Sequence, residues 1–341
     1  MPSRYPFFDR SRLRLRPLAE RVHDVYVERD VLAVGDRPCP YEHTDLPALA
    51  GAIVEARRRG AAVVAMMGAH VIKQGLSRYV IDLLRGGWLS ALAVNGACAI
   101  HDYELARAGA TSESVARYIA EGQFGLWTET GEINDIVRAG AAEGLGFGEA
   151  LGRAVSGGRA PGGAGLPNRD ESQLEAPAIP HKDVSIFAAA YEAGVPITVH
   201  VGVGYDILHE HANFDAAAAG EASYRDFLIF AKVVERLEGG VLMCWGSAVM
   251  GPEVFLKALA RARNVARQEG REIRRFTSAV FDLLTLSGDL HAEAPKDSPE
   301  YYYRPYKTIL VRTVKDGGRS FYFRGDHKAT IPALHALLAR Q

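Results

Sequence analysis

Short apolar runs without polar alternation constrain the fold of this chain more than any other feature of its sequence. Runs of this kind lie at 61–68, 89–96, 195–204, 239–246, 276–286, 308–314 and 320–325. Segments with helical spacing of their apolar residues lie at 46–60, 77–87, 183–194, 223–237, 252–270 and 331–340. Continuous apolar runs that alternate with amphipathic helices are typical of parallel strands covered on both faces. We therefore predict an α/β fold with a doubly wound, mostly parallel Rossmann-like sheet.

The alternation of apolar runs with amphipathic helices begins near residue 46 and indicates how the chain is divided. Residues 1–45 are rich in arginine and proline, and we interpret them as an N-terminal extension. Residues 46–341 then form a single α/β domain. Within it, the Gly- and Pro-rich segment 154–180 has almost no periodicity. Because structureless loops of this length are uncommon in compact domains, we expect this loop to be functional or mobile.

Composition excludes several classes of protein. The 341 residues include 40 basic and 41 acidic side chains, so no overall charge favours nucleic acid or a membrane surface. Three widely spaced cysteines without a CxxC pair argue against a disulfide framework and favour a reducing compartment. The N-terminus has no apolar leader, and no run of apolar residues is long enough to span a bilayer. We expect a soluble, cytoplasmic protein.

The residues that follow the predicted strands are the best candidates for a ligand site. In an open parallel sheet, ligands bind beyond the carboxyl ends of the strands, near the point where strand order reverses. Most of these tails contain glycine, which lets backbone N–H groups approach a phosphate. Nucleotide binding is therefore plausible, but no GxGxxG opens a helix after the first strand and no Walker A motif is present. Ordinary turns that need glycine explain the same pattern.

Histidines form a second candidate set. His200, His209 and His211 lie close together in the sequence, with His70 and His101 after two other strands. Histidine and carboxylate side chains are the usual ligands of catalytic zinc, so a metal-dependent hydrolase is an alternative. There is no HExxH motif, and two histidines two residues apart diverge on a turn; we predict no metal. A GxSxG nucleophile elbow is also absent.

One lysine stands at the end of an aromatic stretch, YYYRPYKTILVRT at 301–313. Tyr303 and Tyr306 flank Lys307, and the predicted strand at 308–314 follows it. Burial would disfavour the ammonium form and make the amine a nucleophile for imine chemistry. The alternative is an ordinary surface lysine whose stem packs on the tyrosines.

Several stretches in the same order resemble the deoxyhypusine synthase family. Pro299 stands eight residues before Lys307, and Asp326 in RGDHKATIP stands six residues before Pro332, the intervals that the family shows. Weaker similarity to the family's glycine-tipped strands and following helices is present at 67–102, 122–135, 185–206 and 239–251. The resemblance implies a deoxyhypusine synthase-like NAD-binding fold. It also implies a cytoplasmic homotetramer.

The implied reaction is an NAD-dependent transfer of an aminobutyl-type group between amines through a lysine imine. The enzyme would be a transferase acting on a polyamine or another small amine, as in deoxyhypusine or homospermidine synthesis. Lys307 would be the covalent residue, with His209 and Asp206 beside it on the turn after a strand. Residues that match the family's NAD site are His70, Gly75, Asn95, Gly96, Ala97, Asp102, Gly204, Gly246, Ser247 and Asp326.

The substrate-binding positions depart from the family pattern. Tyr301 and Pro305 stand where the family has acidic residues and a tryptophan. We expect a rebuilt amine site in which tyrosine rings provide cation–π contacts and carboxylates provide charge. Its candidate residues are His101, Glu253, Asp289, Glu293, Tyr301 and Tyr303. These departures leave open a small-molecule acceptor, a metal-dependent hydrolase, or a non-catalytic NAD-binding paralogue.

Overall fold

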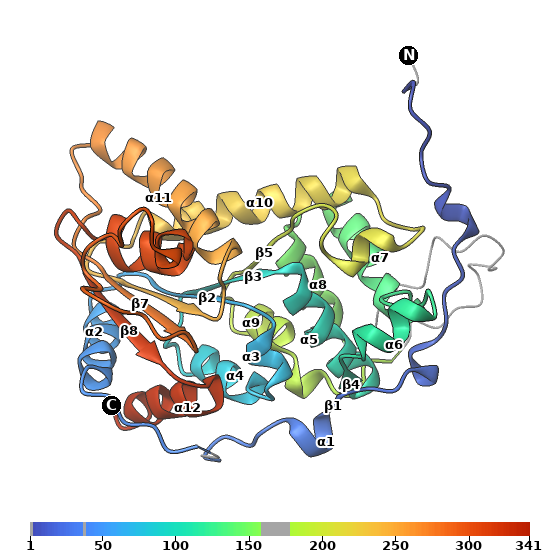
Figure 1. Cartoon of the computed structure of the whole chain (residues 1–341), viewed down its shortest axis with the longest axis horizontal. Coiled ribbons are helices and arrows are strands. Elements are labelled where there is room, and N and C mark those ends of the chain that lie inside the picture. The colour runs from blue at the N-terminus through green and yellow to red at the C-terminus, as the bar shows by residue number, and fades with distance from the viewer. Residues whose placement is uncertain (1–2, 37–38, 158–177) are drawn as a thin grey trace.

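The structure is a computed structural model, and it describes residues 3–36, 39–157 and 178–341. Within these residues, six parallel strands form a central sheet in the order β5-β3-β2-β6-β7-β8 (Figure 1). The strands are β2 (Val63–Met67), β3 (Ala91–Asn95), β5 (Ile197–His200), β6 (Val241–Trp245), β7 (Thr277–Asp282) and β8 (Arg319–Arg324). The chain adds strands outward from β2 to β5, then returns to the other side of β2 and continues from β6 to β8. This confirms the predicted doubly wound, Rossmann-like α/β fold.

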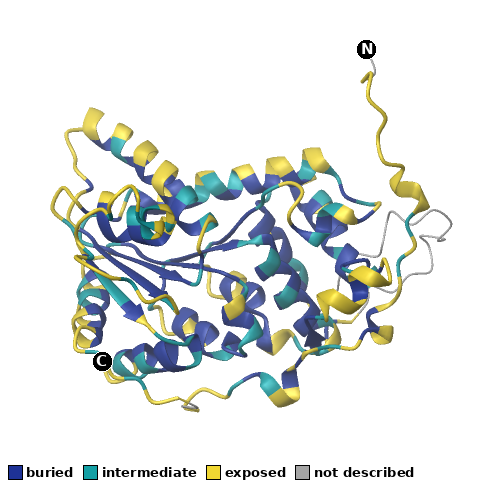
Figure 2. Cartoon of the chain, in the orientation of Figure 1, coloured by how far each residue is buried: buried dark blue, intermediate teal, exposed yellow. Residues whose placement is uncertain are grey.

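The sheet is buried on both faces, as Figure 2 shows. In β2, Val63, Ala65 and Met67 belong to one apolar cluster. Val64 and Met66, which alternate with them, belong to the cluster on the opposite face. Because successive side chains of a strand point to opposite faces, a strand buried on both sides has no polar alternation. That is why the apolar runs identified these strands.

Helices form a layer on each face of the sheet. One apolar cluster joins α2, α4, α5, α7, α8, α9 and α12 to the sheet, and the other joins α10 and α11 to it. The helices are α1 (Val27–Asp30), α2 (Leu46–Arg58), α3 (His70–Lys73), α4 (Ser77–Arg85), α5 (Gly96–Ala108), α6 (Val115–Ala120), α7 (Thr128–Ala142), α8 (Phe147–Ser156), α9 (Ile186–Glu192), α10 (Ala216–Val234), α11 (Met250–Gln268) and α12 (His327–Leu338). None of the helices in the described part of the chain combines the length and apolar composition of a membrane span.

The N-terminal extension is attached to the domain by a strand pair and an ion pair. β1 (Val25–Tyr26) pairs with β4 (Ala110–Thr111) in an antiparallel two-stranded sheet. The buried Arg21 guanidinium donates to both carboxylate oxygens of Glu104 in α5, at 3.0 and 2.5 Å. Of the predicted loop 154–180, α8 takes the residues up to Ser156, and residues 158–177 lie outside the described residues.

The predicted strand at 308–314 is wrong. These residues belong mostly to a π-helix, η7 (Pro305–Arg312), which connects β7 to β8. Ile309, Leu310 and Val311 are buried in η7, and the Ile309 carbonyl accepts a hydrogen bond from Ser278 in β7. A short apolar run that is buried all round cannot be assigned to strand or helix by periodicity. Lys307 therefore lies inside a helix and not at the start of a strand.

Candidate functional site

The switch in strand order lies between β2 and β6, and the turns that follow these two strands touch. A Cβ atom on Gly68, the residue after β2, would lie 2.5 Å from the carbonyl oxygen of Gly246, the residue after β6. Gly68 must therefore be glycine for the turns to meet as they do. The two backbones therefore approach closely at the switch point, and doubly wound folds generally bind ligands beyond the carboxyl ends of the strands at such a point.

Two features favour glycine at position 246: its backbone conformation and the nearness of a histidine side chain. Its φ is +63°, a left-handed value that favours glycine. A Cβ atom there would lie 2.5 Å from Nε2 of His327, the first residue of α12. His327 is buried, and its Nδ1 has no hydrogen-bond partner. Burial lowers the pKa of His327, so the ring is neutral near pH 7.

A hydrogen bond connects the start of α12 to the segment after β2. Asp326 is the N-cap of α12, where its Oδ1 accepts from the backbone N–H of Lys328 at 2.8 Å. Its second oxygen, Oδ2, accepts from Nε2 of Gln74 at 3.2 Å. Gln74 follows α3, the short helix after β2. Asp326, a predicted NAD contact, is thus held at the carboxyl edge of the sheet.

The first turn of α5 forms the other side of the candidate site. Asn95, the last residue of β3, is the N-cap, and its side chain accepts from the backbone N–H of Cys98 at 3.2 Å. A Cβ atom on Gly96 would overlap the carboxylate oxygen Oδ2 of Asp206. Asp206 is 5% exposed, and this oxygen has no hydrogen-bond partner. An unpaired carboxylate oxygen therefore lies over the positive end of α5.

Asp206 and His209 form a capping box on the turn after β5. Asp206 is the N-cap of η5 (Ile207–Glu210), and the backbone N–H of Asp206 donates to Nδ1 of His209 at 3.3 Å. Burial raises the pKa of Asp206 to about 7 and lowers that of His209. A carboxyl group with a pKa near neutrality can exchange a proton with a substrate under ordinary conditions.

The other residues predicted for NAD divide into two groups. His70, Ala97, Gly204 and Ser247 lie in the turns or first helical turns after β2, β3, β5 and β6. Gly75 and Asp102 have structural surroundings instead: Gly75 packs against the backbone of Asp30, and the buried Asp102 accepts from Ser185 Oγ at 2.5 Å and from Ile186 N–H at 2.7 Å.

Lys307 lies on η7 within a different set of side chains. Its Nζ is 3.4 Å from the centre of the Tyr301 ring, and Lys307 is only half-buried. The same surface holds the ion pair between Arg312 and Glu293, at 2.7 Å. Tyr303 points elsewhere and donates to Asp282 Oδ2 at 2.5 Å.

The remaining predicted substrate residues do not gather around Lys307. Glu253 lies on α11 and pairs with Lys257 and Arg304. The exposed Asp289 accepts from the backbone N–H of His291 at 2.9 Å. His101 lies in α5, where its Nδ1 is 2.8 Å from Thr111 Oγ1. Their contacts within the described residues are with other protein groups, and the rebuilt amine site stays a prediction.

The three histidines of the metal-dependent alternative point to separate partners. His200 Nε2 is 3.0 Å from Thr198 Oγ1, and the ring packs on Phe230. His211 Nε2 is 2.9 Å from the Gly125 carbonyl, while His209 faces the backbone of its own turn. Among the described residues, no three His, Cys, Asp or Glu side chains form a group that can hold a metal ion. This geometry does not support the hydrolase alternative.

Sequence reasoning missed four residues of the carboxyl edge: Gly68, Gln74, Trp245 and His327. Trp245 is fully buried at the end of β6, and its Nε1 has no partner. Gly68 and His327 each stand directly beside a predicted strand tip or motif, in AVVAMMG and RGDH. Gly68 and His327 could therefore have been identified from the same positions in the sequence as their neighbours.

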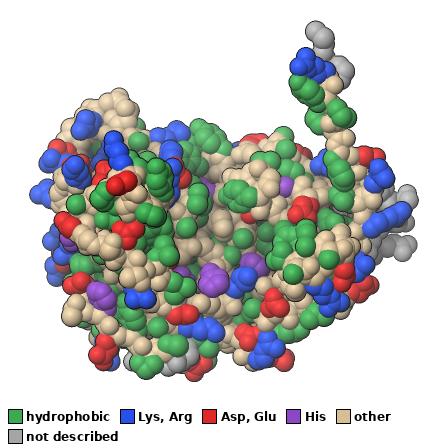
Figure 3. Space-filling view, viewed as in Figure 1, with side chains coloured by type: hydrophobic (Ala, Val, Ile, Leu, Met, Phe, Trp, Pro, Cys, Tyr) green, Lys and Arg blue, Asp and Glu red, His purple; other side chains and the backbone are tan. Residues whose placement is uncertain are grey.

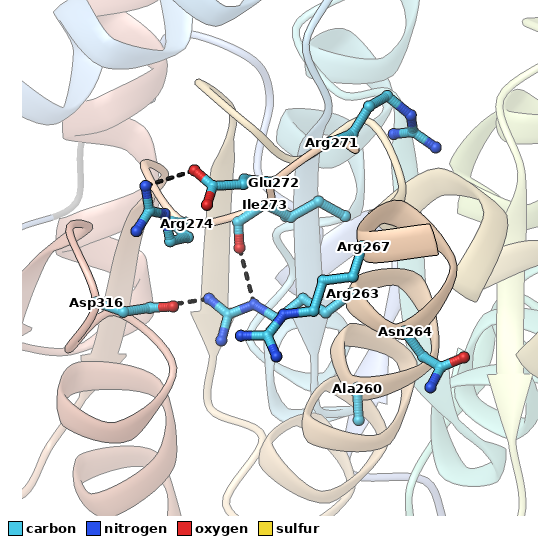
Figure 4. A pocket seen from close by; sticks show the side chains of 9 residues that line it. All are labelled: Ala260, Arg263, Asn264, Arg267, Arg271, Glu272, Ile273, Arg274 and Asp316. Carbon is cyan, nitrogen blue, oxygen red and sulfur yellow. Dashed lines mark hydrogen bonds and ion pairs between the residues drawn. The ribbon is translucent and has the colours of Figure 1, made fainter. Parts of the chain in front are cut away.

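An arginine-rich pocket of about 410 Å³ lies at the opposite end of the sheet, near the amino ends of β7 and β8. Figure 4 shows the side chains that line it. Four arginines line it, and three of them pair with carboxylates: Arg263 with Asp316, Arg271 with Glu269, and Arg274 with Glu272. Arg263 also donates to the Ile273 carbonyl at 2.8 Å. Most of the positive charge is thus paired with carboxylates, and the pocket lies where α11 meets the segments that precede β7 and β8.

Comparison with known proteins gives structural neighbours only. No family model matches the chain, and no curated protein matches it. The cyanobacterial arginine dihydrolase ArgZ is 14% identical over 88% of this chain and 33% of its own, with a TM-score of 0.46. A putative LOR/SDH protein from Methanococcus maripaludis S2 is 12% identical over 91% and 74%, with a TM-score of 0.47. AgrE, solved with ornithine and NAD+, is 14% identical over 86% and 32%, with a TM-score of 0.47.

This chain thus spans about a third of ArgZ and AgrE. The prediction of a deoxyhypusine synthase-like aminobutyl transferase acting on polyamines is wrong. The matching structures named here are an arginine dihydrolase, AgrE and a putative LOR/SDH protein, and none is described as a transferase of that kind. The strand that the prediction placed directly after Lys307 is also absent, because Lys307 and the residues that follow it belong to η7. Resemblance to the deoxyhypusine synthase family as such stays a prediction.

Proposed function

We propose that this chain binds NAD at the carboxyl edge of its sheet and uses it to oxidise or reduce a small polar substrate. The observation that carries the proposal is the contact of Gly68 with Gly246 at the switch between β2 and β6. Two backbones that meet without side chains leave room for a flat, extended ligand above them. Doubly wound sheets bind dinucleotides across this crevice.

Unpaired polar atoms at the same edge fit such a ligand. Within the described residues, Gln74 Oε1, Asp206 Oδ2, Trp245 Nε1 and His327 Nδ1 are buried and lack hydrogen-bond partners. Buried polar groups in proteins are nearly always paired, so a concentration of unpaired ones needs a reason. A ligand rich in hydroxyl, amide and phosphate groups can supply the partners after a small adjustment of these side chains.

The residues that would hold NAD come from both sides of the switch. The turns at Gly68 and Gly246 offer backbone groups, and His327 offers a neutral imidazole. The first turn of α5, at Gly96 and Ala97, offers N–H groups with the positive end of the helix dipole. NAD, when bound, supplies a hydride acceptor.

Asp206 is the residue of this chain that we assign to proton transfer. Removal of a hydride from a carbon that bears a hydroxyl or amine group requires that a base take the proton from the oxygen or nitrogen. The Asp206 carboxyl lies beside the first turn of α5, and burial raises its pKa to about 7. His209, whose Nδ1 accepts from the backbone of the same turn, fixes the turn that carries Asp206.

Calorimetric titration with NAD, NADH and NADP tests the proposal. We expect saturable binding that Gly246→Ala weakens by at least about tenfold, or about 1.4 kcal/mol, since the methyl group would enter the space of His327. Gly220→Ala on α10 is the matched control, because a Cβ atom there meets nothing within 4 Å. Equal binding by both variants, or no binding by the unaltered protein, would overturn the proposal.

Turnover is tested separately. Absorbance of the reduced nicotinamide reports oxidation across a panel of small hydroxy acids, amino acids and amines. Asp206→Asn keeps the shape of the side chain and removes its acid–base function, so we expect NAD binding to persist and turnover to fall. Binding without turnover on any substrate would leave the non-catalytic NAD-binding alternative in place. A cytoplasmic location and a homotetrameric assembly, both implied by the resemblance, stay predictions.

A further inference from the structure

The first residues of the described chain form an arm that leads away from the domain (Figure 1). Tyr5, Phe7 and Phe8 on this arm are 64%, 84% and 78% exposed. Figure 3 shows apolar and basic side chains along it. Three aromatic side chains exposed within four residues form an apolar surface of the kind that marks an interaction site.

A second exposed apolar surface lies on α6 (Val115–Ala120). Val115 and Ile119 are 55% and 63% exposed, and they lie four residues apart, on one side of the helix. Ala116 and Ala120 are exposed as well. The opposite side of α6 is fixed to the domain by Tyr118, which is 1% exposed. The exposed residues of this helix are therefore not needed for its own packing.

The arm and α6 are joined at their base. Leu18 packs in one small cluster with Tyr118 of α6 and with Trp127. Nearer the arm, the backbone N–H of Arg16 donates to the Leu126 carbonyl at 3.2 Å, and Arg10 donates to the Phe214 carbonyl at 2.5 Å. The arm therefore begins beside α6, is fixed as far as Arg10, and extends freely beyond that point.

We propose that this arm docks on α6 of a second copy of the chain, and that the second copy returns the contact. The reciprocal exchange follows from having both surfaces on one chain, as in isologous dimers. Pro6 has no backbone N–H, so the arm would dock through its aromatic side chains and not by adding a strand to an edge of the sheet.

The available area is sufficient for a stable dimer. Each buried aromatic side chain removes about 150 Å² or more from water, so three give about 450 Å² per arm. The surface that an arm covers loses a similar area. Because the three side chains are 64–84% exposed, two arms with their docking sites bury at most about 1,800 Å², against a range of about 1,200–2,000 Å² for stable interfaces.

Sedimentation velocity of the full chain tests this assignment. The unaltered protein is expected to self-associate, and both Phe7→Ser/Phe8→Ser and Val115→Glu/Ile119→Glu are expected to be monomers. Since the changed side chains are exposed, circular dichroism and unfolding midpoints should stay as in the unaltered protein. Leu256→Ser on α11, whose side chain is 37% exposed, is the control and should still self-associate.

A mixture of the two variants distinguishes arm exchange from nonspecific association. The arm variant keeps an intact α6, and the α6 variant keeps an intact arm, so a mixed pair has one complete contact. The mixture, at concentrations well above those at which the unaltered protein associates, should form heterodimers that neither variant forms alone, and these should be weaker than the unaltered dimer because one of the two contacts is missing. Monomeric unaltered protein, variants that still associate, or a mixture that stays monomeric would each overturn the proposal. So would monomers that float with phosphatidylcholine–phosphatidylserine vesicles through the arm, because the arm would then be a membrane contact.

Discussion

Asp206 lies against Gly96, so its unpaired carboxylate oxygen takes the space that a Cβ atom on Gly96 would need. The contact joins the turn after β5 to the first turn of α5, and these two elements form one wall of the proposed NAD site. Oδ2 of this carboxyl group has no hydrogen-bond partner and therefore remains available to a ligand.

Gly96→Ala should displace the Asp206 side chain. The added methyl group overlaps its carboxylate, and adding a methylene-sized group to a packed site typically costs about 1–3 kcal/mol of stability. Urea unfolding measures this cost, and calorimetry should show weaker NAD binding in the same variant. Gly51→Ala on α2 is the control: a Cβ atom there meets nothing within 4 Å, so stability should be unchanged or higher. Equal stability of the two variants would contradict the described contact.

The Asp206 carboxyl should make stability fall as pH rises. Burial raises its pKa to about 7 in the folded state, against about 3.9 in the unfolded chain. Between these values the folded state holds the proton and the unfolded state has lost it, so the free energy of unfolding decreases with pH. Asp102 and Asp226, whose pKa values burial also raises to about 7, act in the same direction.

Asp206→Asn removes one of these three contributions. Relative to the unaltered protein, the variant should gain stability from about pH 4 to about pH 7, by an amount on the order of a few kcal/mol. Denaturant unfolding at several pH values measures the difference. A constant difference across this range would show that the Asp206 carboxyl titrates normally.

The Arg21–Glu104 pair should be essential to the attachment of the N-terminal extension. Both side chains are 1% exposed, and Glu104 also accepts from Thr111 and Thr130, each at 2.6 Å. Breaking a buried pair leaves an uncompensated charge, which typically costs about 3–5 kcal/mol. We expect this loss for Glu104→Gln. Glu121→Gln, which breaks exposed pairs with Arg16 and Arg117, should cost less than about 1 kcal/mol, and similar losses would refute the assignment.

Lys307→Met should leave NAD binding unchanged. Nζ of Lys307 lies over the Tyr301 ring beside the Arg312–Glu293 pair, and Lys307 is only half-buried. Methionine keeps much of the apolar stem, so the stability of η7 should change by less than about 1 kcal/mol. Calorimetry and urea unfolding of the variant measure both quantities. A large loss of NAD affinity would contradict this prediction and would show that Lys307 contributes to the NAD site.

The fold could be predicted because strands buried on both faces leave a continuous apolar run in the sequence. The same property caused the error at 308–314, because Ile309, Leu310 and Val311 are buried in a π-helix as completely as residues in a strand. Periodicity measures which sides of an element are buried. It cannot separate two elements when every side is buried.

The candidate site could be predicted only as far as the strand ends. Gly246 and Asp326 were assigned to NAD from the resemblance to the deoxyhypusine synthase family, and both lie at the carboxyl edge, directly after β6 and shortly after β8. The contact between Gly68 and Gly246 depends on β2 and β6 being neighbours, although the residues are far apart in the sequence. Strand order is a tertiary property, so one sequence without its fold could not reveal that contact.

A crystal structure of the protein grown with NAD tests the central claim most directly. We predict a dinucleotide that crosses from β2 to β6 above Gly68 and Gly246, within hydrogen-bonding distance of His327 and the first turn of α5. A dinucleotide bound elsewhere, such as in the arginine-rich pocket beside Arg263, would contradict the account. So would crystals in which saturating NAD leaves the carboxyl edge of the sheet without ligand.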